Sequence, residues 1–94
     1  MTTMDAYRMK IEAALRELQA DLDKLDARIQ GAEADARLWF ERERRAFEAK
    51  EHRLRDRLHE LERASSGAME EVKRGVDEAW ADLKASFERA RDRF

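Results

Sequence analysis

Neither cysteine nor proline occurs in this chain of 94 residues, and glycine occurs only three times, as Gly31, Gly67 and Gly75. The absence of cysteine excludes disulfide bonds and thiolate chemistry. The absence of proline removes the residue that breaks helices most strongly. The chain also lacks a run of about 18 apolar residues that could cross a bilayer. Its first five residues lack the basic and apolar regions of a signal peptide. We therefore expect a cytoplasmic protein.

Charged residues make up 45% of the chain, yet the formal net charge is only −2. Such a balance gives no bulk attraction toward nucleic acid or anionic lipid. A high content of Ala, Glu, Leu, Arg and Lys with helical periodicity is typical of coiled coils and long helices. No alternating run of β-branched residues indicates a strand. We therefore predict an all-α protein with a single helical domain over residues 1–94.

Apolar residues in the first third of the chain recur at alternating spacings of four and three. This heptad seam favours a left-handed coiled coil. In a simple hairpin the seam has no partner within the chain, so we expect self-association as a homo-oligomer. The seam consists of Ile11, Leu15, Leu18, Leu22, Leu25 and Ile29, and it continues through Ala32 and Ala36.

Gly31 is the weakest point of the first helix, because glycine in a helix interior costs about 1 kcal/mol relative to alanine. The seam nevertheless passes through Gly31 without a change of phase. We interpret the region as one continuous helix over residues 4–63. The alternative is a break at Gly31, which would give three helices of nearly equal length and a three-helix bundle.

The seam shifts by one residue at Trp39 and Phe40, and the residues downstream are in phase with Phe40. The two adjacent aromatic side chains can serve both registers, which predicts a wide core layer. A change from a heptad to an eleven-residue register relaxes the supercoil. The seam after Trp39 and Phe40 contains Phe47, Leu54, Leu58 and Leu61.

Residues 64–67 predict a turn, because two serines and a glycine are poor helix formers and Ser66 can cap a new helix. An amphipathic return helix is predicted over residues 68–94. Its pattern repeats after eleven residues, or about three helical turns, so its apolar residues share one face. These residues are Met69, Val72, Val76, Trp80, Leu83, Phe87 and Phe94. The predicted fold is thus a long helical hairpin or coiled coil.

His52, Asp56 and His59 would lie on one face of a helix, in a geometry that zinc could use. Neighbouring arginines disfavour a divalent ion there, so we interpret this face as solvated. The chain contains no Ser-His-acid arrangement and no glycine-rich phosphate loop. We therefore expect no enzyme activity, no catalytic residues, no cofactor and no metal site.

One segment points to a known family: residues 65–84 read SSGAMEEVKRGVDEAWADLK, and residues 87–90 read FERA. This segment resembles a family of short bacterial coiled-coil proteins, generally described as coiled-coil domain-containing or stress-response proteins. In that family the position of Met69 often holds Trp. The resemblance implies a soluble bacterial helical protein whose role is poorly defined, and it gives no catalytic residues to carry over.

The function expected from these patterns is that of a non-enzymatic structural or interaction module that self-associates. A protein partner could also bind through a helix face. The alternative is a peripheral membrane- or lipid-binding protein, because residues 68–94 carry Trp80, Phe87 and Phe94 on one face. A third hypothesis is a nucleic-acid-associated coiled coil, because a basic run extends from Arg42 to Arg57. Acidic residues interrupt this run, so we do not expect nucleic-acid binding.

Overall fold

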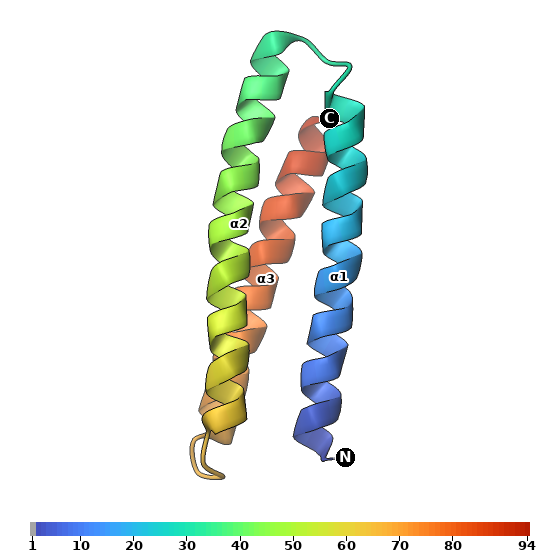
Figure 1. Ribbon diagram of the computed structural model, residues 1–94. Helices are drawn as coiled ribbons and strands as arrows, with labels where there is room; N and C mark the ends of the chain where they lie inside the picture. The colour runs from blue at the N-terminus through green and yellow to red at the C-terminus, as the bar shows by residue number, and fades with distance from the viewer. Residues whose placement is uncertain (1) are drawn as a thin grey trace.

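Three α-helices joined by two short connections make up residues 2–94, the part of the chain that the computed structural model describes (Figure 1). Helix α1 comprises Thr3–Ile29, α2 comprises Ala34–Arg63, and α3 comprises Met69–Arg93. The helices form an elongated bundle of 51 × 20 × 17 Å. The all-α fold predicted from the sequence is confirmed, and its form is that of the three-helix bundle.

The predicted continuous helix over residues 4–63 is not observed, because α1 ends at Ile29 and α2 begins at Ala34. The last turn tightens: the Ala32 N–H donates to the Ile29 carbonyl at 2.9 Å, and Glu33 is extended with ψ 158°. The reversal buries the α1 seam within the chain, where Leu15 and Ile29 are each 2% exposed. Burial of six large apolar side chains outweighs the few helical hydrogen bonds lost at the break.

Helix α1 begins with a capping box between Thr2 and Asp5. The Asp5 N–H donates to Thr2 Oγ1 at 3.1 Å, and the Thr2 N–H donates to Asp5 Oδ2 at 3.2 Å. These bonds satisfy two backbone donors that a helix end otherwise leaves without partners. The hydrogen bond from the Thr2 N–H is the main reason that the pKa of Asp5 lies below its ordinary value.

The core lies along the axis of the bundle, and all three helices contribute to it. Its most completely buried side chains are Phe40, Leu15, Leu54, Leu83 and Val76. The polypeptide reverses direction again over residues 64–68, so α3 runs back alongside α2 and α1 and the C-terminus lies near the α1–α2 connection (Figure 1).

The buried face of α3 contains small residues that the eleven-residue pattern did not identify. Its buried residues are Val76, Ala79, Leu83, Ser86, Phe87 and Ala90. The spacing Val76, Ala79, Leu83, Ser86, Ala90 alternates three and four, so the centre of this face is itself a heptad seam. Ala79, Ser86 and Ala90 have short side chains, and the backbones of α2 and α3 approach more closely than α1 approaches either.

Candidate interaction surface

Helix α1 forms the outer layer of the bundle, because its backbone lies farther from α2 and α3 than these two lie from each other. Its six seam residues are nevertheless buried. Large side chains, mainly Leu and Ile, therefore span the gap between α1 and the α2–α3 pair. The face of that pair which receives α1 is the candidate interaction surface, and we call it the α1 groove.

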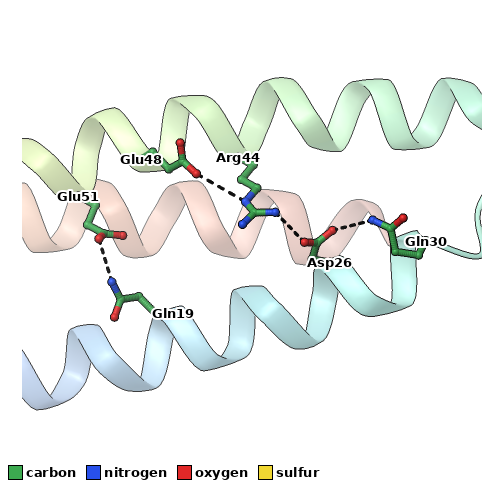
Figure 2. Close-up of polar contacts among 6 residues, drawn as sticks. All are labelled: Gln19, Asp26, Gln30, Arg44, Glu48 and Glu51. Carbon is green, nitrogen blue, oxygen red and sulfur yellow. Dashed lines mark hydrogen bonds and ion pairs between the residues drawn. The ribbon is translucent and has the colours of Figure 1, made fainter.

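Polar side chains flank the seam where α1 meets α2 (Figure 2). Arg44 Nη1 on α2 lies 2.7 Å from Asp26 Oδ2 on α1, and Arg44 Nε lies 3.6 Å from Glu48 Oε1. Two turns further along the bundle, Gln19 Nε2 donates to Glu51 Oε1 at 2.8 Å. Because these groups are partly exposed, each pair contributes at most about 1 kcal/mol. Their main effect is to fix the axial position of α1.

Tyr7 attaches the beginning of α1 to α3. Its hydroxyl donates a hydrogen bond to the Asp77 carboxylate, and the hydroxyl oxygen lies 3.3 Å from the Lys73 carbonyl oxygen. Lys73 Nζ lies 4.9 Å from the centroid of the Tyr7 ring. Burial, and then the hydrogen bond to Asp77, raise the pKa of Tyr7 well above its ordinary value of 10.0. Arg8 pairs at the same end with Glu62 of α2.

An aromatic cluster closes the opposite end of the bundle. The ring centroids of Trp39 and Phe94 are 5.3 Å apart, and those of Phe40 and Phe94 are 6.2 Å apart. The Arg93 guanidinium lies 4.2 Å from the centroid of a Trp39 ring. The adjacent aromatics that mark the register shift therefore pack against the end of the chain. They also lie where α2 begins, next to the connection from α1.

The residues singled out as an apolar stripe are all buried or half-buried in the structure. The half-buried ones are Trp39, Met69, Val72, Trp80 and Phe94. The buried ones are Ile11, Leu15, Leu18, Leu22, Leu25, Ile29, Phe40, Phe47, Leu54, Leu58, Leu61, Val76, Leu83 and Phe87. The stripe of α1, which was expected to need a second chain, thus has its partner within the same chain.

The histidine face is solvated in the bundle. His52 and His59 are exposed, with His52 Nε2 3.6 Å from Asp56 Oδ2 and His59 Nδ1 3.9 Å from Glu62 Oε2. Across residues 2–94, no group of three or more His, Cys, Asp or Glu side chains is arranged to hold a metal ion.

Acidic side chains pair with several cations of the basic run. Lys50 lies 3.6 Å from Asp82 on α3, Arg55 lies 3.2 Å from Glu51, and Arg57 lies 3.1 Å from Glu60. Arg44 is engaged with Asp26. This part of α2 therefore presents mixed charges rather than the continuous positive stripe that phosphate backbones favour.

Sequence reasoning missed Tyr7 and the small buried residues of α3. The heptad spacing of Ala79, Ser86 and Ala90 from Val76 was the available signal, but short side chains give it little weight beside Trp80 and Phe87. Large apolar side chains are exposed at only two positions of the described chain, Met9 at 50% and Leu38 at 60%.

None of the helices within residues 2–94 combines the length and apolar character needed to cross a membrane. Comparisons of the chain with models of known protein families, with curated proteins and with solved structures found no significant match.

Proposed function

We propose that this chain is a non-enzymatic structural or interaction module that self-associates through its helices and acts in the cytoplasm of a bacterium during stress adaptation. The observation that supports self-association best is the unequal packing of the bundle. Helices α2 and α3 form a close pair, and α1 lies on that pair as a separate layer. The assignment to stress adaptation has a single support, the resemblance of residues 65–90 to the bacterial coiled-coil family.

The α1 groove has the chemistry of a helix-binding site. Its floor is apolar, with Phe47 of α2 beside Leu22 and Phe87 of α3 beside Leu25, and its edges carry charged groups such as Arg44 and Glu51. Grooves of this kind bind amphipathic helices whose apolar residues recur at i, i+3, i+4 and i+7. Helix α1 has that pattern, and another helix with the same pattern would satisfy the same contacts.

The two alternative functions have less support. In the closed bundle Phe87 is buried and Trp80 is half-buried, so the aromatic face that motivated lipid binding is largely occupied by protein. The mixed charges of α2 likewise give nucleic acid no continuous positive surface. Neither alternative fits the surface of the bundle as well as self-association through the α1 groove does.

Sedimentation equilibrium from micromolar to millimolar concentration tests the proposal. We expect a dimer or larger species whose fraction rises with concentration. Leu38→Ala tests the alternative of a surface contact, because Leu38 is the most exposed large apolar side chain of the described residues. If Leu38→Ala abolished association, the contact would be a surface patch. A monomer over the whole range would contradict self-association.

A further inference from the structure

We propose that the associated form is a dimer in which two copies exchange α1. In each chain residues 30–33 become helical, so that α1 and α2 join into one helix from Thr3 to Arg63. The α1 segment of one copy then occupies the α1 groove of the other. This inference rests on the proposed self-association and identifies its partner as a second copy of the chain.

The connection between α1 and α2 has little in its sequence that requires a turn. Residues 30–33 read QGAE, and Gln30 already has helical dihedral angles, φ −59° and ψ −25°. Within residues 2–94 no glycine has a positive φ, and Glu33 makes no side-chain hydrogen bond as the N-cap of α2. A Cβ at Gly31 would meet only the Arg28 carbonyl oxygen, at 3.8 Å. Nothing local therefore prevents these residues from continuing the helix.

The apolar faces of α1 and α2 are in register for such a continuation. The last buried residue of α1 is Ile29, and the first of α2 is Phe40. They are eleven residues apart, which is close to three full turns of a helix. A continuous helix would therefore present both seams on one side. Two such helices, antiparallel, would cover each other's seam from end to end.

Exchange would remake between chains the contacts that α1 makes within one chain. The pair of Asp26 with Arg44 and the bond from Gln19 to Glu51 both join α1 to α2 (Figure 2). The bond from Tyr7 to Asp77 joins α1 to α3. Each of these contacts joins a residue of α1 to a residue of α2 or α3. The groove of a second copy therefore offers α1 the same partners. Only residues 30–33 change their conformation.

The exchanged dimer differs from the closed bundle in its dimensions. At about 1.5 Å per residue, a helix over residues 3–63 is about 90 Å long. The closed bundle is 51 Å in its longest dimension. Small-angle scattering of the isolated dimer should therefore show a rod nearly twice as long as the monomer.

The decisive variant is Ala34→Pro, with Ala34→Ser as its matched control. Ala34 is the first residue of α2, a position that favours proline, and Glu33 before it is extended, as the residue before proline prefers. The closed bundle therefore accepts the substitution. In a continuous helix, however, position 34 is internal, where proline removes a hydrogen bond and clashes with the preceding turn. We expect Ala34→Pro to weaken dimerisation by about a hundredfold or more, and Ala34→Ser to leave it nearly unchanged.

A distance measurement distinguishes exchange from other association. Because the chain has no cysteine, Lys10→Cys and His59→Cys carry two spectroscopic labels at defined positions. Both positions lie near the Arg8–Glu62 pair, at one end of the bundle. Labelled chains are refolded at millimolar concentration with an excess of unlabelled chain, and the dimer is isolated. Within one labelled chain, we expect the labels about 70 Å apart in the dimer and close together in the monomer.

The results separate this inference from the proposed function. A dimer with a short distance within each chain, or one that Ala34→Pro leaves intact, would overturn exchange while self-association stands. The absence of any dimer at millimolar concentration would overturn both. If Ala34→Pro did not fold, the label distances in the otherwise unchanged chain would still decide the question.

Discussion

Replacement of Leu15 by alanine tests whether α1 shares one cooperative core with α2 and α3. Leu15 lies in the middle of the α1 seam and is 2% exposed. If α1 is an integral layer, the substitution removes apolar contacts across the whole bundle. If α1 docks only weakly, the α2–α3 pair keeps its stability and the loss is confined to α1.

The expected magnitude follows from burial. Removing a fully buried leucine side chain costs about 2–5 kcal/mol, including the cavity left behind. A three-helix bundle of 20 × 17 Å in cross-section can partly collapse around the gap, so we expect about 2–3 kcal/mol. The total stability of a domain of this size is roughly 5–15 kcal/mol. The midpoint of thermal unfolding should therefore fall by about 10–20 °C.

Urea and thermal unfolding, followed by circular dichroism, provide the measurement. Leu54→Ala, at a fully buried position of α2, is the positive control, and Leu38→Ala, at 60% exposure, is the negative control. We expect Leu15→Ala to behave like Leu54→Ala, with one cooperative transition. A loss no larger than that of Leu38→Ala would refute the reasoning. So would two separate transitions in the unsubstituted chain.

The remaining predictions concern α3 and its contacts. Stability should fall as the pH rises above 10.0: the unfolded Tyr7 ionises there, whereas the hydrogen bond to Asp77 and burial keep the folded pKa of Tyr7 higher. Tyr7→Phe should remove this alkaline loss, and because Tyr7 is the only tyrosine, the tyrosinate absorbance reports its pKa directly. Gly75→Ala should raise the free energy of unfolding by about 0.5–1 kcal/mol, as measured in urea, because helical glycine is unfavourable. The added methyl group would lie at an ordinary 3.7 Å from Arg57 Cδ. A destabilised Gly75→Ala would mean that the α2–α3 contact cannot accept even this group.

The apolar side of each helix could be predicted because large apolar residues mark the buried face of a helix in the sequence. Leu22, Leu58 and Leu83 each belong to an apolar series whose spacing places it on one face of its own helix, and burying that face is favourable whatever the topology. The same reasoning fails for Ala79 and Ser86. Their short side chains say little about burial in the sequence, and they become buried because the α2 backbone comes close enough to cover them.

The sequence offered the end of α1 only as an alternative, a break at Gly31, because nothing local fixes that end. Gly31 has no conformation that demands glycine, and the seam continues beyond it in phase. Tertiary packing ends α1, because the chain reversal buries Ile29 and its neighbours against α2 and α3, and this burial lowers the free energy of the folded state. Tyr7 was missed for the same reason, since its partners are about seventy positions away, at Asp77 and Lys73.

Residues 30–33 connect α1 to α2, and their preference for a turn or a helix influences the concentration at which exchange should appear. In the closed bundle, the short connection over residues 30–33 holds α1 beside its groove at an effective concentration of about millimolar. A second copy offers the same contacts without that advantage, but it adds helical hydrogen bonds across residues 30–33 and removes the tight turn after Ile29. Exchange therefore competes with closure only near millimolar concentration, unless residues 30–33 are made better helix formers. Gly31→Ala favours the helical form of residues 30–33 by about 1 kcal/mol per chain, and two chains contribute to each dimer. The exchange mechanism thus requires Gly31→Ala to lower the concentration needed for dimerisation, in the direction opposite to Ala34→Pro.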